Sequence, residues 1–127
     1  MRVTRLLGIA MLGLWPSFAF AMDSSDITLK TTEDLYQVCS VPADNPDHSR
    51  ALSFCEGFLL ATASYDYAIS DRAHLRRFIC APDTVTRDQG IQAFVDWAKA
   101  HLQNQKYMDA PPVEGVVRGL AAKWPCK

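Results

Sequence analysis

The stretch "CAPDTVTRDQ", residues 80–89, places a cysteine a few residues ahead of a helix start. Thr86 and Gln89 have the spacing of a capping box, in which a hydroxyl and an amide side chain close the first helical turn. Pro82 keeps the incoming chain extended. Beyond the box, apolar residues recur at helical spacing, which predicts a helix from Thr86 onward. These apolar residues are Ile91, Phe94, Val95, Ala98 and Leu102.

Three further helices are predicted around this one. The first begins within residues 31–34, where threonines and acidic residues suit a helix start, and it stops before Pro42. The second runs from about residue 46 to residue 69, and the last occupies residues 113–124. No stretch has the alternation of a convincing strand. The sequence therefore predicts a small all-α domain of four helices with short links and at most one extra helical turn.

The second helix is predicted to be central because it is apolar on more than one face. One stripe comprises Leu52, Cys55, Leu59 and Thr62, and the other comprises Phe54, Phe58, Ala61 and Tyr65. Gly57 in the middle of this helix indicates that another backbone passes close to it. The aromatic residues at helical spacing are also expected in the core, namely Tyr65, Tyr67, Trp97 and Trp124. The remaining link, residues 70–79, is polar and basic and is predicted to be a connection with at most one helical turn.

Residues 1–21 have the pattern of a secretory signal peptide. Arg2 and Arg5 precede an apolar run, and the run ends in a small-residue cleavage site at residues 19–21. No second apolar segment of about 20 residues follows, so we expect no membrane contact after cleavage. The mature protein is predicted to comprise a flexible segment, residues 22–30, and one helical domain, residues 31–127.

The charge of the mature chain argues against a nucleic-acid partner. Loss of Arg2 and Arg5 leaves 11 basic residues against 14 acidic ones, a net charge near -3. Most of the acidic residues are scattered and are expected to face solvent. Asp66, Asp71, Asp88 and Asp96 are among those expected to face solvent.

All four cysteines lie in the exported part of the chain and are expected to form disulfides. Their spacings of 16, 25 and 46 residues contain no CxxC, which disfavours a zinc site. Short links make neighbouring helices antiparallel, and this arrangement favours the pairs Cys39 with Cys55 and Cys80 with Cys126. Three pairings remain possible from the sequence alone.

The chain carries no recognisable catalytic motif. It lacks GxSxG, HExxH, a P-loop and a close pair of carboxylates with a supporting base. The histidines, His48, His74 and His101, have no catalytic signature around them, and we expect neither a metal nor a cofactor. These observations favour a binding or inhibitor domain over an enzyme.

The order of four motifs resembles a known family. The chain contains "LYQVC", "CEGFLL", "CAPDTVTRDQ" and "LAAKWPC" in this order, over residues 31–126. This order is similar to that of the type VI secretion amidase immunity proteins, the Tai group and its Rap relatives. The chain departs from the family pattern at Ala61, Ser64 and residues 101–103, which affects loops and surfaces more than the residues that build the fold.

The resemblance implies a periplasmic protein that binds a peptidoglycan amidase delivered by a neighbouring cell and blocks its active-site cleft, commonly as a homodimer. The partner would meet exposed loops, and the two candidate stretches are residues 70–77 and 103–109. They carry side chains that suit an interface or an acidic partner surface. The candidate residues are Arg72, Arg76, Arg77, Lys106 and Tyr107.

Two other functions remain open from the sequence. The scaffold could serve a periplasmic chaperone-like stress protein, which would protect many unrelated clients in acid. An enzyme would have to use the unassigned histidine and aspartate side chains, and substitution of a histidine would then abolish turnover.

Overall fold

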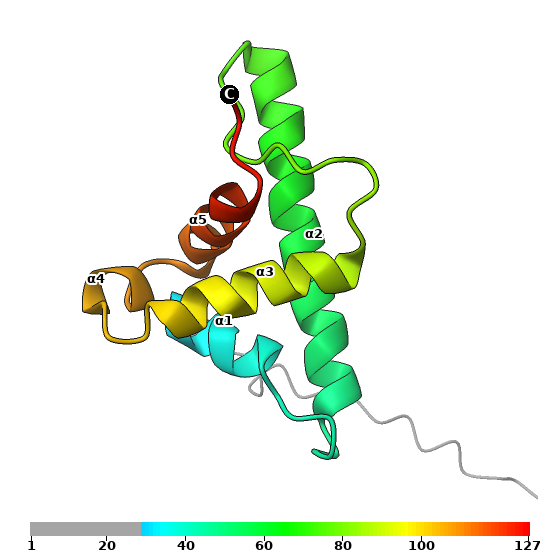
Figure 1. Ribbon diagram of the computed structural model, residues 1–127, viewed down its shortest axis with the longest axis vertical. Coiled ribbons are helices and arrows are strands. Elements are labelled where there is room, and N and C mark those ends of the chain that lie inside the picture. Colours follow the sequence, from blue (N-terminus) through cyan, green and yellow to red (C-terminus); the bar gives the residue numbers. More distant parts are fainter. Residues whose placement is uncertain (1–28) are drawn as a thin grey trace, which may run out of the picture.

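The structure, a computed structural model, describes residues 29–127 and is helical (Figure 1). Its helices are α1 (Thr32–Cys39), α2 (His48–Ala73), α3 (Arg87–Ala100), α4 (Gln105–Met108) and α5 (Pro112–Lys123). Among the described residues the only strand-like pairing is an isolated antiparallel bridge between Ile79 and Pro125. The four predicted helices correspond to α1, α2, α3 and α5, and α4 is a short helix in a stretch that the sequence predicts to be a break. The all-α prediction is therefore confirmed, while the predicted signal peptide lies outside the described residues.

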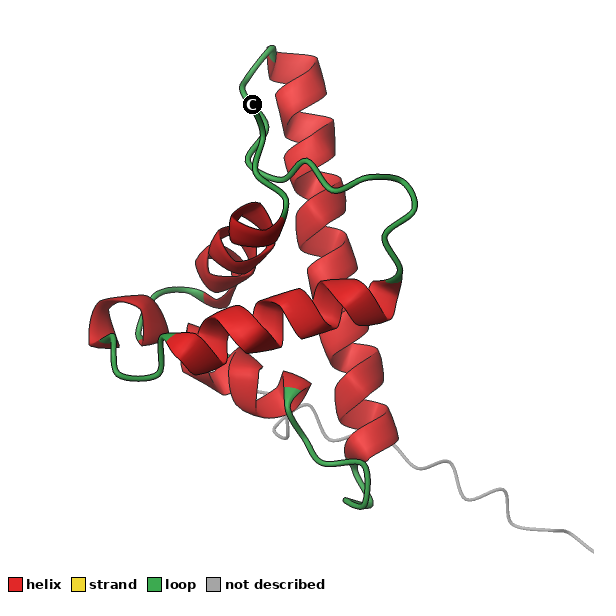
Figure 2. Ribbon diagram, in the orientation of Figure 1, coloured by secondary structure: helices red, strands yellow, loops and turns green. Residues whose placement is uncertain are grey.

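Helix α2 is the long axis of the molecule, and α1, α3 and α5 pack against one side of it (Figures 1 and 2). The core lies where these helices meet. Its largest fully buried apolar side chains come from different helices and are Phe94, Leu35, Met108 and Val116. Cys55 and Leu59 are the buried contribution of α2. The upper part of α2 extends beyond this core, so much of its surface has no helix against it (Figure 2).

Two glycines allow α5 to approach its neighbours closely. A Cβ atom at Gly115 would lie 2.3–2.9 Å from the side chain of Thr32, and one at Gly119 would lie 3.2 Å from the Cα atom of Phe94. The Thr32 hydroxyl also donates to the Ala110 carbonyl over 3.0 Å, which ties α1 to the link ahead of α5. Small residues at these contacts therefore set the distance between helices.

Two capping boxes define the starts of α1 and α3. The hydroxyl of Thr86 accepts from the Gln89 backbone N–H, and the Gln89 side chain accepts from the Thr86 N–H over 2.9 Å, as the sequence predicts. Thr31 and Asp34 form the same reciprocal pair at α1. Because each box satisfies backbone donors that have no partner within the helix, both helices begin at defined residues.

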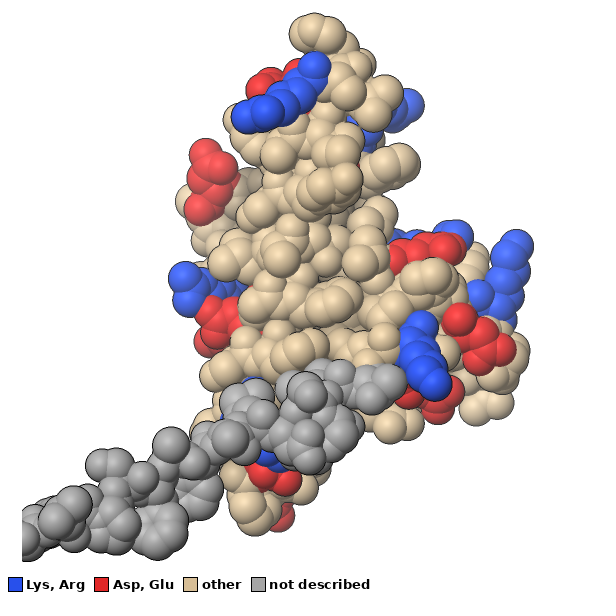
Figure 3. Space-filling model, turned by 180° about the vertical axis from the view of Figure 1, so that it is seen from behind, with Lys and Arg blue, Asp and Glu red and all other residues tan. Residues whose placement is uncertain are grey.

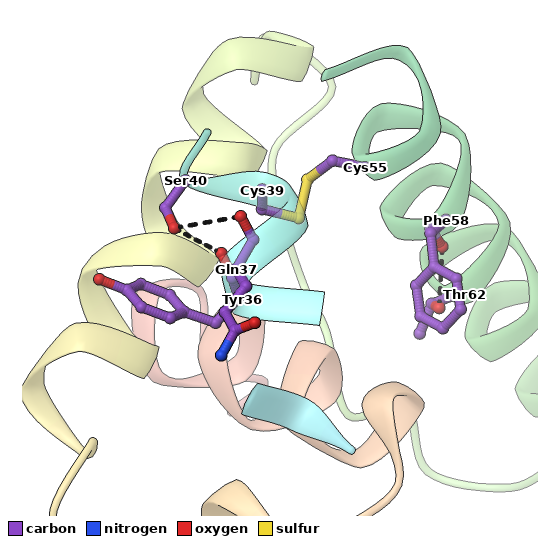
Figure 4. The surroundings of a disulfide bond; sticks show 7 residues. All are labelled: Tyr36, Gln37, Cys39, Ser40, Cys55, Phe58 and Thr62. Carbon is purple, nitrogen blue, oxygen red and sulfur yellow. Dashed lines mark hydrogen bonds between the residues drawn. A yellow bond between two sulfur atoms is a disulfide. The ribbon is translucent and has the colours of Figure 1, made fainter. Parts of the chain in front are cut away.

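Two disulfides fasten the ends of the helices. Cys39–Cys55 joins the last residue of α1 to α2, next to the Ser40 hydroxyl that donates to the Tyr36 carbonyl at the end of α1 (Figure 4). Cys80–Cys126 joins the segment ahead of α3 to the C-terminal end, beside a hydrogen bond from Cys80 N–H to the Trp124 carbonyl. These are the pairs that the helix order favours.

The predicted connection, residues 70–79, begins with one helical turn. Residues 70–73 continue α2, because nothing in them breaks a helix, and α2 ends where His74 adopts a left-handed conformation with φ of 51°. Other local predictions were wrong. Gly57 has no atom of another segment near its Cβ position, so no backbone crosses there. Leu102 is exposed because α3 ends at Ala100, before the apolar stripe is complete. Tyr65 and Tyr67 also lie on the surface, because no helix covers their part of α2.

Candidate partner-binding surface

An apolar groove separates the C-terminal half of α2 from α5. Its volume is about 570 Å³. We call it the α2–α5 groove and define it by its lining residues: Phe58, Ala61, Thr62, Tyr65, Asp66, Ile69, Ser70, Leu75, Arg76, Phe78, Val113 and Val117. Tyr65 and Phe78 remain 66% and 65% exposed, although they line a concave surface. Large apolar side chains exposed in a concave surface are typical of a binding site.

The wall of the groove is built by a chain reversal after α2. The backbone N–H groups of His74 and Leu75 both donate to the Ser70 carbonyl, and the left-handed His74 turns the chain back along α2. A residue with a side chain rarely adopts this conformation, so the two hydrogen bonds help to hold it. The reversal places Leu75, Arg76 and Phe78 beside the last turns of α2.

Asp66 holds the returning segment against α2. Its two carboxylate oxygens accept from the backbone N–H groups of Phe78 and Ile79, each over 3.2 Å. The residue is only 8% exposed, so the prediction that Asp66 faces solvent was wrong. A carboxylate can be buried here because the two backbone donors replace water. Asp71, Asp88 and Asp96 are exposed as predicted.

The three candidate arginines gather at this end of α2. Arg76 lines the groove, Arg72 is exposed in the last turn of α2, and the Arg77 guanidinium lies 4.9 Å from the ring centroid of Tyr67. None of the three forms an ion pair with another residue in the range 29–127. In Figure 3, basic side chains lie beside an acidic one at the upper end of the molecule, and the middle of the surface below them is largely uncharged.

The other two candidates, Lys106 and Tyr107, lie in α4 at a different corner of the molecule (Figure 1). Tyr107 packs against the rings of Trp97 and His101, with centroids 5.7 Å and 5.4 Å away. The Arg118 guanidinium covers Tyr107 at 4.7 Å from the ring centroid. Tyr107 is therefore a half-buried packing residue, and the structure does not bring the two candidate stretches together.

A second hollow, of about 720 Å³, lies between α3 and α5. Its floor includes the half-buried rings of Trp97 and Trp124, and polar side chains such as Gln92 and Asp96 form its rim. Gln92 donates to Asp96 within this rim over 2.7 Å, so part of its polarity is satisfied internally. The surface is more polar than the α2–α5 groove.

The described histidines contact backbone carbonyls rather than catalytic partners. Nδ1 of His48 lies 2.8 Å from the Val41 carbonyl oxygen, and Nδ1 of His101 lies 2.6 Å from that of Trp97. His74 serves as the left-handed residue after α2. Within residues 29–127 no group of three or more histidine, cysteine, aspartate or glutamate side chains could hold a metal ion.

The helical domain, both disulfides included, matches the model of a known protein family. The family model described as Rap1a immunity proteins matches residues 31–126. The chain belongs to the Rap1a immunity protein family. The match extends from the cap of α1 to the last cysteine, and it confirms the resemblance that the four motifs indicate. No curated protein and no solved structure gives a significant match.

An immunity protein acts by binding an effector. Membership of the Rap1a family therefore indicates that the functional residues lie on the surface of this domain. The sequence predicted the basic residues of the groove wall but not its apolar side chains. Phe58 and Tyr65 were assigned to the core, and Leu75, Phe78 and Val113 were not singled out as site residues. Periodicity shows that a helix face is apolar, but it does not show whether another element covers that face.

Proposed function

We propose that this protein is a periplasmic immunity protein that binds and inhibits a peptidoglycan amidase delivered by type VI secretion. The observation that carries the proposal is the match of residues 31–126 to the Rap1a immunity proteins. The amidase as target is supported by the four ordered motifs, which resemble those of the amidase immunity proteins.

The architecture suits an inhibitor that acts without chemistry of its own. Two disulfides, two capping boxes and the Asp66 hydrogen bonds hold the surface loops in one conformation. A preorganised surface loses little entropy on binding, so a modest interface can bind tightly. Such a surface can occlude the active-site cleft of an enzyme by contact alone.

A periplasmic location is supported by two features of the chain. Residues 1–21 have the pattern of a signal peptide, and the disulfides need an oxidising compartment to form and persist. In the described part of the chain, no helix is both long enough and apolar enough to cross a bilayer.

A homodimer is part of the proposal. The outer surface of α2 offers room for a second copy, because Leu60 is 51% exposed and lies near small or exposed residues such as Ser64 and Ala68. Small residues let two helices approach closely. Light scattering coupled to gel filtration should give twice the mass of one mature chain, and the mass of a single chain would contradict this part of the proposal.

The test of the proposed function begins with a pull-down. The mature protein, residues 22–127, is used as bait under non-reducing conditions, with secreted proteins and periplasmic extract of the strain that encodes it. We expect one stoichiometric partner with a catalytic cysteine. That partner, once purified, should hydrolyse peptidoglycan, and an excess of the immunity protein should abolish the hydrolysis.

Two results would contradict the proposal. Unchanged hydrolysis in the presence of excess protein would show that the recovered enzyme is not inhibited. Recovery of many unrelated proteins, and only at acidic pH, would favour the chaperone-like alternative on the same scaffold.

A further inference from the structure

We propose that the α2–α5 groove is the docking site for the effector, and that it takes an apolar side chain projecting from a segment that carries carboxylates. The inference rests on the proposed function, because the occupant is the inhibited enzyme. It adds the surface that binds and the chemistry of the segment that is bound.

The first argument is the unusual apolar exposure of the groove. Leu75 and Val113 are 57% and 50% exposed, and they line the groove together with the exposed rings of Tyr65 and Phe78. Each such aromatic side chain can bury about 150–250 Å² in an interface. Exposed apolar residues gathered in one hollow are unfavourable in water unless a partner covers them.

The second argument is the composition of the groove, which is that of a binding hot spot. Tyrosine and arginine are enriched among the residues that dominate binding energy, and Tyr65 and Arg76 both line the groove. Lysine and glutamate, which are depleted from the centres of interfaces, are absent from the lining, and its one carboxylate, Asp66, is buried. The hollow between α3 and α5, in contrast, is lined by Lys123 and by the exposed Asp96.

The third argument is the positive charge at the edge of the groove, which determines the kind of partner segment that can bind there. Arg76 lines the groove, Arg72 and Arg77 lie at the same end of α2, and Asp71 is the only exposed carboxylate among residues 66–78. The carboxylate of Asp66 is occupied by backbone donors, so it does not neutralise these arginines. The edge of the groove is therefore cationic, and it favours a partner segment that bears aspartate or glutamate around an apolar anchor.

The same charge disfavours a second copy of this chain in the groove. In a two-fold symmetric dimer a surface patch meets its own copy, so the arginines of one groove would approach those of the other. Like charges brought together in an interface repel each other, which weakens such a dimer. An enzyme with an acidic surface does not incur this cost.

The groove is also held in shape before any partner binds. The Asp66 hydrogen bonds fix the returning segment at Phe78 and Ile79, and Cys80, the next residue, is linked to Cys126. The cation–π contact of Arg77 with Tyr67 orients a side chain at the cationic edge. A partner therefore meets a formed hollow and loses little free energy to ordering.

The test measures inhibition of the purified amidase recovered in the pull-down, using variants of the full mature protein. Tyr65→Ala and Phe78→Ala remove exposed groove side chains and should leave the fold intact. Each should raise the inhibition constant by about 30-fold or more, the size expected for a hot spot. The matched control is Leu102→Ala, which removes an exposed leucine outside the groove and should leave the inhibition constant within about twofold of the wild type.

A second pair of variants tests the charge. Arg76→Glu should slow association with the amidase and weaken inhibition by more than tenfold at low salt, because it reverses the sign of the groove edge. Lys99→Glu makes the same charge change on an exposed residue of α3 and should leave both quantities nearly unchanged. Circular dichroism melts confirm that every variant folds.

The outcomes separate three cases. If the wild-type protein inhibits and the groove variants inhibit equally well, the docking proposal is overturned while the proposed function stands. If a groove variant changes the molar mass of the free protein in light scattering, the groove belongs to a second copy, and the docking proposal is overturned whatever the inhibition. If the wild-type protein itself does not inhibit, the proposed function fails first, and the docking proposal fails with it.

Discussion

At the scale of single residues, Asp66 shows how one side chain can position a binding surface. It lies on the buried side of α2 and accepts two backbone hydrogen bonds from the segment that forms the groove wall. A neutral apolar residue at this position would pack against the core but would leave both N–H groups without a partner. The carboxylate therefore holds the returning chain against α2.

We predict that Asp66→Ala destabilises the protein by about 2–4 kcal/mol, because two backbone donors, one buried and one partly buried, lose their partner. Denaturation with urea measures the change. Asp71→Asn is the matched control, since this carboxylate is exposed on the same helix, and it should change the stability by less than about 0.5 kcal/mol. Equal effects of the two substitutions would contradict the role of Asp66 in holding the returning chain against α2.

Asp34 gives a prediction for pH. Backbone hydrogen bonds from Lys30 and Thr31, followed by the Thr31 hydroxyl, lower the pKa of this carboxyl below its ordinary value of 3.8. A pKa lowered in the folded state means that the group stabilises the fold above its unfolded pKa, and that this stabilisation is lost as the pH falls through the folded pKa. Asp34→Asn should therefore lower the Tm at pH 7 and lose its effect in acid.

Melting curves from pH 7 down to about pH 2.5 test this prediction. Glu33→Gln is the control, because it removes a carboxylate from the same helical turn without removing a capping hydrogen bond. If both variants show the same pH dependence, the charge near the helix end matters and the capping bonds do not.

At the scale of elements, two helical glycines have opposite roles. Gly57 lies in α2 and Gly115 in α5, and the sequence predicts a close backbone only at Gly57. The structure shows open space at Gly57 and contact with Thr32 at Gly115. Thr32 cannot turn away freely, because its hydroxyl is bonded to the Ala110 carbonyl.

We predict that Gly57→Ala stabilises the protein by about 0.5–1 kcal/mol, since alanine favours the helix and nothing obstructs its methyl group. Gly115→Ala should destabilise it by about 1–3 kcal/mol through the clash with Thr32. Thermal melts of the two variants measure both changes. A stabilising Gly115→Ala would show that α1 and α5 can separate without cost, contrary to the packing.

The difference between local contacts and contacts distant in the chain explains what the sequence could and could not predict. Local rules predicted the capping box of Thr86 and Gln89, because both partners lie within one turn. Helix order favoured the disulfide pairs, because chain neighbours lie side by side. The burial of Asp66 depends on Phe78 and Ile79, which reach it only after a chain reversal, so no local pattern indicated it.

At the scale of the whole molecule, the two disulfides stabilise different parts of this small domain. Cys39–Cys55 spans 16 residues and lies inside the core, where Cys55 has no exposed surface. Cys80–Cys126 spans 46 residues and lies at the surface, where it fastens the C-terminal end to the groove wall. The first supports the fold, and the second supports the surface that the docking proposal uses.

We predict that mild reduction opens Cys80–Cys126 before Cys39–Cys55. A thiolate must reach a sulfur atom to exchange with it, and Cys80 is exposed whereas Cys39 and Cys55 are buried. Stepwise treatment with dithiothreitol, followed by alkylation and peptide mass spectrometry, measures the order. Equal labelling rates at all four cysteines would contradict it, because that result requires the core to open as readily as the surface.

Opening of the surface disulfide has a defined expected effect. The chain-entropy model assigns about 4 kcal/mol to a loop of this length, so Cys80→Ala with Cys126→Ala should shift the urea midpoint strongly downward. The double variant should still fold, because the core helices and Cys39–Cys55 are untouched. Hydrogen exchange should then quicken in residues 74–81 while α1 and α3 stay protected, because only the groove wall has lost its anchor. Faster exchange throughout the domain would instead mean that the two disulfides act as one unit.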